Sequence, residues 1–196
     1  MVTDDAHHAV WNERSSVWAR YCVTKDELDV EELQRTCRTW LVRNYGRERR
    51  EWAYLGVPPR LLVEGYLRGP DGTGPAEYKF WVVHGRVQLI AVIVDRFTDL
   101  QLVYMDRDWN PAGVEGVHSR PGQRAVPAPA RLAEMLRMAE ALAAPVDMVR
   151  VDLYDLGARA VVGELTNYPS SGRQPFEPES FDLELGRTWT VPARYR

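Results

Sequence analysis

The chain has 196 residues, of which 45% are hydrophobic and 27% charged. This length is enough for one sizeable domain or for two small lobes that share a cleft. The composition is that of an ordinary globular protein and excludes the disordered, collagen-like and membrane-embedded classes. The net charge of −3 offers no general attraction for nucleic acid, so we expect no nucleic-acid partner.

Local features agree with these exclusions. An arginine run at Arg43–Arg50 follows an expected helix, where such a run is typically a solvated face. The longest apolar run, Leu89–Val94, is too short to cross a bilayer, and we expect no membrane insertion. Cys22 and Cys37 cannot form a metal site or a disulfide framework unaided, and no apolar leader opens the chain, so we expect a cytoplasmic protein.

The N-terminal region is expected to contain one amphipathic helix. Residues 1–23 show no clear hydrophobic period, and we expect them to be mobile. Thr24–Glu27 has the spacing of a capping box, and Asp26 or Asp29 could cap the same helix equally well. The helix is expected to end near Asn44–Gly46. Its apolar stripe consists of Val30, Leu33, Cys37, Trp40 and Leu41.

Strands dominate the pattern after Pro58-Pro59. The residue types predict strands at Arg60–Leu67, Glu77–Val83 and Arg86–Val94. The last of these is almost wholly apolar and is therefore expected to be the central strand. Arg107–Pro129 is rich in glycine and proline and predicts a loop. Helices are expected at Ala130–Ala143 and after Pro178, which gives an α+β fold with a mainly antiparallel sheet.

Two acids lie near the ends of a further predicted hairpin. Residues 149–154 and 160–162 have β-branched and aromatic character, and Gly157 marks the turn between them. A three-residue loop or a glycine bulge would put Asp152 and Glu164 on one face, whereas a two-residue loop would put them on opposite faces. On one face they could hold a divalent cation; two acids on a solvated face are the alternative.

Magnesium is the cation that these residues would suit. It prefers hard oxygen ligands, and its usual partners are one or two carboxylates plus substrate phosphates. Asp152 and Glu164, with an oxygen of Thr166 or Asn167, provide such ligands. No Cys or His stands close to them in sequence, which disfavours zinc.

A second pair of charges lies on the strand that begins at Glu77. Glu77 and Lys79 share one face by the two-residue period of a strand. An acid for ribose hydroxyls beside a cation for phosphate would suit a nucleotide, and a cross-strand ion pair is the alternative. Arg96, just after the apolar strand, could contact a phosphate or pair with Asp95.

From about residue 25 to residue 190 the chain resembles the TupA-like ATP-grasp family of teichuronopeptide biosynthesis. The motifs that carry the resemblance occur in family order and are Pro59–Glu64, Glu77–Phe80, Asp95–Phe97, Asp108–Asn110, Arg150–Tyr154, Gly163–Thr166 and Tyr168-Pro169. ATP-grasp proteins bind ATP in a cleft between two α+β lobes. The resemblance therefore implies an N-terminal lobe at residues 1–66 and a C-terminal lobe with a metal-binding hairpin at residues 67–196.

The resemblance also implies an activity and roles for individual residues. Most family members ligate a carboxylate to an amine through an acyl-phosphate, so small-molecule carboxylate and amine substrates are implied, with ATP and Mg²⁺ as cofactors. The nucleotide would be bound by Glu64, Tyr66, Leu67, Glu77 and Lys79. The cations near the reacting phosphate would be Lys79 and Arg96. The metal ligands would be Asp152, Glu164, Thr166 and Asn167, the last lying one place late.

Departures from the family pattern concern the phosphates and the acceptor substrate. The family normally carries a lysine and an Asn-His-Gly-Ser-Gly-type loop, but the corresponding stretch, Val10–Ser16, has neither lysine nor glycine. This loss weakens a backbone grip on phosphate. Ser170 replaces a common glycine. We also expect the usual N-terminal subdomain to be missing, so that a second copy or a partner subunit would supply it. A truncated, non-catalytic nucleotide-binding or partner subunit is therefore the alternative to a ligase.

Overall fold

The computed structural model describes residues 28–63, 65, 67–70, 74–94, 101–116, 125–167, 169–191 and 193. The chain divides into two compact units, Met1–Tyr66 and Leu67–Arg196. The helices are α1 Val30–Leu41, α2 Tyr45–Arg49, η2 Trp52–Tyr54, α3 Leu132–Ala143, η3 Pro169–Gly172 and α4 Glu179–Thr188. The strands are β1 Glu77–Val83, β2 Arg86–Val94, β3 Gln101–Met105, β4 Glu115–Gly116, β5 Met148–Asp155, β6 Ala160–Thr166 and β7 Phe176–Glu177.

The described part of the first unit is helical. Of the possible caps for α1, Asp29 is the one observed, because its side chain accepts a hydrogen bond of 2.9 Å from the backbone N–H of Glu32. The α2 helix was not expected. It begins where the side chain of Asn44 accepts from the N–H of Arg47, and it ends at Arg50 in the left-handed conformation. Arg43 of the arginine run forms an exposed ion pair with Glu48.

The strand predicted at Arg60–Leu67 was wrong over its described residues. Residues 60–63, 65 and 67 form no strand, and Leu62 and Val63 are 82% and 76% exposed. A strand is stabilised by cross-strand pairs and by burial of one face. This apolar run has neither in the part of the chain that the structure describes. Glu64 and Tyr66 lie outside the described residues.

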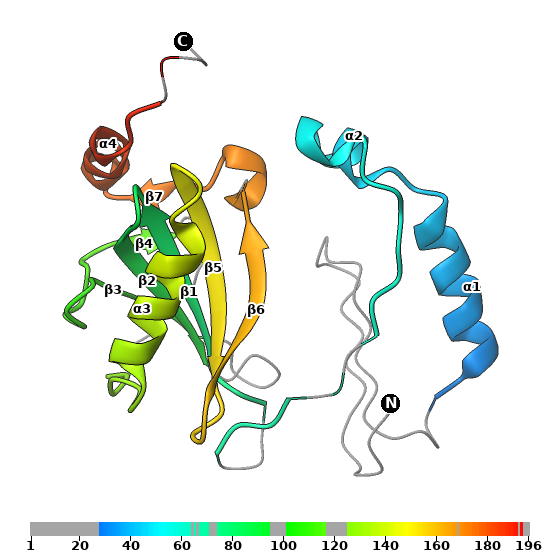
Figure 1. Ribbon diagram of the computed structural model, residues 1–196, viewed down its shortest axis with the longest axis horizontal. Coiled ribbons are helices and arrows are strands. Elements are labelled where there is room, and N and C mark those ends of the chain that lie inside the picture. Colours follow the sequence, from blue (N-terminus) through cyan, green and yellow to red (C-terminus); the bar gives the residue numbers. More distant parts are fainter. Residues whose placement is uncertain are drawn as a thin grey trace. The chain divides into compact units, whose positions relative to one another are not determined.

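The second unit is built on a five-stranded antiparallel sheet in the order β3-β2-β1-β5-β6 (Figure 1). The predicted strands at Glu77–Val83 and Arg86–Val94 are confirmed, as is the hairpin of β5 and β6. β1 is the middle strand of the five, and β2, which was expected to be central, is also an interior strand because it pairs with both β1 and β3. β3 was not expected, although its residues Leu102–Tyr104 are typical of a strand.

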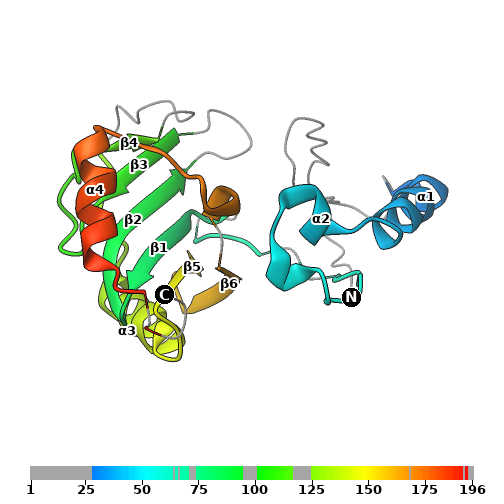
Figure 2. The same cartoon turned by 90° about the horizontal axis from the view of Figure 1, so that it is seen from above.

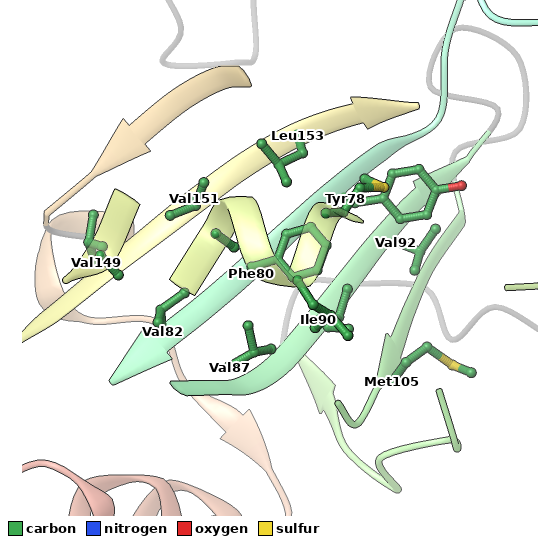
Figure 3. Close-up of a cluster of buried hydrophobic side chains, with 14 residues drawn as sticks. Tyr78, Phe80, Val82, Val87, Ile90, Val92, Met105, Val149, Val151 and Leu153 are labelled. Atoms are coloured by element: carbon green, nitrogen blue, oxygen red, sulfur yellow. The ribbon is translucent and has the colours of Figure 1, made fainter. Parts of the chain in front are cut away.

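One face of the sheet packs against α3 around a tight apolar core. Phe80, Val82, Ile90 and Val151 are fully buried there (Figure 3). Met135 from the helix is fully buried in the same core. The helix was predicted at almost these bounds, and its apolar stripe faces the sheet. Because α3 covers this face, side chains that could bind a ligand must come from the opposite face of the sheet.

The opposite face is covered at one end by aromatic side chains. Trp81 on β1 and Tyr104 on β3 contact Phe176 of β7 with ring centroids 6.0 and 5.7 Å away, and Phe176 contacts Phe181 of α4 at 5.5 Å. We call Trp81, Tyr104, Phe176 and Phe181 the aromatic cluster. Figures 1 and 2 show α3 and α4 on different sides of the sheet. The part of this face beyond the aromatic cluster carries charged side chains.

The loop predicted at Arg107–Pro129 contains one short strand among its described residues. This strand, β4, pairs with β7 in a separate two-stranded sheet. The terminal helix expected after Pro178 is α4. No helix within the described ranges is both long and apolar enough to cross a membrane.

Candidate functional site

Charged side chains lie in register across three strands of the sheet. Lys79 on β1 pairs with Asp152 on β5, and Asp152 pairs with Glu164 on β6. Residues directly opposite one another in a sheet lie on the same face. Glu77 and Arg150 lie two residues from Lys79 and Asp152 along their own strands, and therefore share this face. We call these five residues the charged cluster.

A bulge at Gly163 brings Glu164 opposite Asp152. Leu153 pairs with Val162, and the next pair is Asp152 with Glu164, so Gly163 is the extra residue on β6. Without the bulge, Glu164 would oppose Val151 and would turn to the α3 face. The turn itself does not give the shared face that the sequence predicted for a three-residue loop or a glycine bulge at that turn. Asp155 pairs with Ala160 across a four-residue loop, and the bulge at Gly163 within β6 places the two acids side by side.

Gly163 is also required by the close approach of a neighbouring ring. A methyl group at this position would lie 2.5 Å from Cε2 of Tyr154, far closer than a normal contact. We therefore expect Gly163→Ala to lower the free energy of unfolding by about 1–3 kcal/mol, the usual cost of overpacking. Chemical denaturation followed by circular dichroism would measure it.

The same substitution elsewhere provides a control of opposite sign. Gly186 lies inside α4, and a methyl group there would meet no atom within 4 Å. Gly186→Ala should raise the free energy of unfolding by about 0.5–1 kcal/mol, because alanine is the better helix former. Equal effects of the two substitutions would contradict the role given to Gly163.

Asp152 is the most buried member of the charged cluster, with a side chain that is 1% exposed. Its Oδ1 accepts from Nε of Arg150 at 2.7 Å, and its Oδ2 accepts from Nη2 of Arg150 at 2.8 Å. Oδ2 also accepts from Nζ of Lys79 at 2.5 Å. A buried carboxylate requires such charge-assisted bonds, because desolvation of an unpaired charge costs several kcal/mol.

Arg150 links the charged cluster to the aromatic cluster. Its Nη2 donates to Oγ1 of Thr166 at 3.0 Å and lies 3.5 Å from Oε2 of Glu164. Its guanidinium carbon lies 5.9 Å from the ring centroid of Trp81, within the range of a cation–π contact. Burial by itself lowers the pKa of Arg150, but its hydrogen bonds to Asp152 and the nearby negative charges outweigh burial and raise the pKa.

Lys79 bridges the two buried acids of its face. Nζ lies 2.6 Å from Oε1 of Glu77 and 2.5 Å from Oδ2 of Asp152. The ion pair that the sequence analysis weighed against a nucleotide role is therefore present. The two readings are compatible, because a cation held between acids can also face a bound phosphate. Glu164 differs from these residues in being 60% exposed.

The structure brings together some of the residues implied by the resemblance and does not describe others. Glu77, Lys79, Asp152, Glu164 and Thr166 share one face of the sheet. Asn167 is exposed just beyond β6, and Leu67 is half-buried outside any strand. The predicted residues outside the described part of the chain are Glu64, Tyr66, Arg96 and the stretch Val10–Ser16.

Arg150 is a member of the site that the sequence analysis left without a role. The signal was available, because Arg150 lies two residues before Asp152 and therefore on the same face of a strand. Thr166, assigned as a metal ligand, here accepts a hydrogen bond from Arg150.

The turn after β6 shows why glycine suits position 170, where this chain has serine. Ser170 and Ser171 have φ values of 50° and 59°, in the left-handed region that favours glycine. A glycine at position 170 would adopt this conformation without strain. In this chain the hydroxyl of Ser170 donates to Oε1 of Gln174 at 2.6 Å, which supports the turn.

The residues of the charged cluster fit Mg²⁺ in donor type. Among the described residues no three His, Cys, Asp or Glu side chains are arranged to hold a metal ion. Mg²⁺ is, however, commonly held by one or two carboxylates, with substrate phosphates completing its shell. Asp152 and Glu164 are such a pair, although Arg150 and Lys79 bind both oxygens of Asp152.

The α+β architecture with mainly antiparallel sheets is that of an ATP-grasp-like fold. The chain belongs to the TupA-like ATP-grasp family, whose model matches residues 15–190. Searches of curated proteins and of solved structures gave no match to the chain. The match to the family model over residues 15–190 is what assigns the chain to its family.

Proposed function

We propose that the protein is an Mg·ATP-dependent ligase that joins a small-molecule carboxylate to an amine, in the biosynthesis of a cell-envelope polysaccharide or a peptide natural product. The observation that carries this proposal is the register of Lys79, Asp152 and Glu164 on one face of the sheet. Family membership supplies the reaction class.

The charged cluster provides acids that suit a metal ion and ribose hydroxyls, and cations that suit phosphates. Asp152 and Glu164 would hold Mg²⁺, which supplies charge neutralisation and alignment of phosphate oxygens when bound. Lys79 and Arg150 would offset negative charge on the phosphates, the arginine through its rigid fork of donors. Glu77 would accept from ribose hydroxyls. Catalysis by these residues would be positional and electrostatic.

Ligand-induced stabilisation tests the nucleotide part of this proposal. At a ligand concentration of about 100 times Kd, Mg·ATP should stabilise the native state by about 2.7 kcal/mol. Glu164→Gln should remove most of the metal-dependent part without lowering the melting temperature of the unliganded protein, because Glu164 is 60% exposed. Thermal melts with Mg·ATP, with ATP alone and with Mg²⁺ alone would separate these contributions.

An exposed acid on α4 provides the matched control. Glu184 lies on the solvated side of that helix, and Glu184→Gln should leave the ligand-dependent shift unchanged. A wild-type melting temperature that does not change in millimolar Mg·ATP would count against nucleotide binding. If Mg·ATP does stabilise the protein, ADP release in the presence of candidate acids and amines would test the ligase step itself.

A second candidate function is that of a non-catalytic ATP-grasp subunit. The observation that favours it is the pairing of both oxygens of Asp152 with Arg150 and Lys79, which makes the charged cluster an internally paired structural network. Such a subunit would bind nucleotide weakly or act through a partner protein. Stabilisation by Mg·ATP without ADP release for any acid and amine pair would favour this function.

A further inference from the structure

We infer that Arg150 and Lys79 block metal binding at Asp152 until a phosphate-bearing anion draws these cations away. The anion and the metal ion therefore bind the charged cluster cooperatively. The inference rests on the proposed function, because it takes the charged cluster as the metal and phosphate site. It concerns the state of the site before either ligand arrives.

The contacts of Asp152 are the first support. A carboxylate offers about four lone-pair sites. Three hydrogen bonds from Arg150 and Lys79 already reach its two oxygens, at 2.5 to 2.8 Å. The side chain is 1% exposed, so water does not provide an easy alternative route to these oxygens. A metal ion arriving alone would find Glu164 accessible and Asp152 occupied.

The charges of the cluster are the second support. Glu77, Asp152 and Glu164 carry three negative charges, and Lys79 and Arg150 carry two positive charges, so the cluster has a net charge of −1. A divalent cation that reached Asp152 alone would lie beside Lys79 and Arg150, which hydrogen-bond its two oxygens, and like-charge repulsion would be strong in this buried setting. A phosphate anion removes this repulsion, because it pairs with the cations and leaves the acids to the metal.

The surroundings of Arg150 provide a route for the exchange. The guanidinium lies over the ring of Trp81 and donates to Thr166, so it retains contacts that do not depend on Asp152. The side chains of Arg150 and Lys79 are 13% and 14% exposed, so each reaches the surface of this face, where an anion would contact it. The coupling of the two ligands must be reciprocal.

Binding of Mn²⁺ alone, followed by electron paramagnetic resonance, tests the inference directly. Arg150→Met deletes the competing cation while keeping an apolar stem over Trp81. It should bind Mn²⁺ more tightly than the wild type by about ten- to a hundredfold, the equivalent of one charge-assisted hydrogen bond of about 1.5–3 kcal/mol. Arg107→Met, which breaks the ion pair with Glu140 beyond the charged cluster, is the control and should not change the Mn²⁺ affinity.

A second variant covers the case in which Arg150→Met does not fold. Arg150→Lys keeps the positive charge but loses the two-pronged contact with Asp152, so it should fold and give an intermediate gain in Mn²⁺ affinity. Inorganic phosphate should increase the Mn²⁺ affinity of the wild type and should have a smaller effect in either Arg150 variant. Free Mn²⁺ would be corrected for its own complex with phosphate.

The outcomes separate this inference from the proposed function. Mn²⁺ affinities that are equal in the wild type and in both Arg150 variants would overturn the inference, even if Mg·ATP stabilises the protein. A gain in Mn²⁺ affinity in the Arg150 variants, without stabilisation of the wild type by Mg·ATP, would support the inference and count against the nucleotide function. Loss of the gained affinity in Arg150→Lys/Asp152→Asn would assign the metal to Asp152, and retention of it would overturn the inference.

Discussion

Replacing Asp152 with asparagine is expected to lower the free energy of unfolding by about 3–5 kcal/mol, the usual cost of removing one partner of a buried ion pair. The side chain of Asp152 is 1% exposed. Loss of its negative charge leaves the positive charges of Arg150 and Lys79 close together with less negative charge to offset them. Urea denaturation of the wild type and of the variant would measure the difference.

A double-mutant cycle would show that the loss comes from the ion pair. Arg150→Met alone should also destabilise the protein, because it leaves Asp152 with Lys79 as its cation in the charged cluster. The double variant Asp152→Asn/Arg150→Met should be more stable than the sum of the single losses predicts, since neither charge is then left unpaired.

A surface ion pair provides the comparison. Nη1 of Arg131, the N-cap of α3, lies 2.6 Å from Oε2 of Glu134 in the helix, and the two side chains are 31% and 37% exposed. Glu134→Gln should change the free energy of unfolding by about 1 kcal/mol or less. If Asp152→Asn cost no more than Glu134→Gln, the charged cluster would not be a structural centre of the sheet.

The hairpins of the sheet could be predicted from the sequence because their signals are local. Alternating and continuous apolar runs with a His84-Gly85 turn between them define β1 and β2. The β5–β6 hairpin is marked in the same way by its turn at Gly157. The order of the strands was harder to predict from the sequence. It depends on whether β1 or β2 pairs with β5, and both strands are apolar enough to be central.

Other parts of the fold depend on contacts between distant segments. β4 and β7 are two residues each and pair across some 60 positions, so neither carries a periodic signal of its own. The strand predicted at Arg60–Leu67 is the opposite case, in which the local signal is present but no strand is observed over the described residues. Its residue types suit a strand, but the described part of the chain provides neither a pairing strand nor a core for it.

The acidic residues of the candidate site could be predicted from the sequence, but the contacts between its side chains could not. The spacing within single strands puts Glu77 beside Lys79 and Arg150 beside Asp152, and a sequence pattern can show this. The bulge at Gly163 decides whether Glu164 joins them, and a glycine in a strand only suggests a bulge. That Arg150 binds both oxygens of Asp152, and that Lys79 from the neighbouring strand shares one of them, could be learned only from the structure.

Trp81 connects the aromatic cluster to the charged cluster, and Trp81→Ala is expected to lower the free energy of unfolding by about 3–5 kcal/mol. Its side chain is 4% exposed and packs edge to face on Phe176. The substitution removes a large buried surface and leaves a cavity between the sheet and α4. Chemical denaturation monitored by near-ultraviolet circular dichroism would measure the loss in the second unit.

Two further variants separate packing from the support of Arg150. Leu183→Ala, on the exposed side of α4 where the side chain is 59% exposed, should change stability by about 0.5 kcal/mol or less. Trp81→Phe keeps an aromatic ring but shortens its reach, so it should cost less than Trp81→Ala while weakening the contact with Arg150. If the guanidinium is positioned by the indole ring, Trp81→Phe should lower the affinity for Mg·ATP by more than its small loss of stability explains. An unchanged Mg·ATP affinity in Trp81→Phe would make Trp81 a packing residue alone.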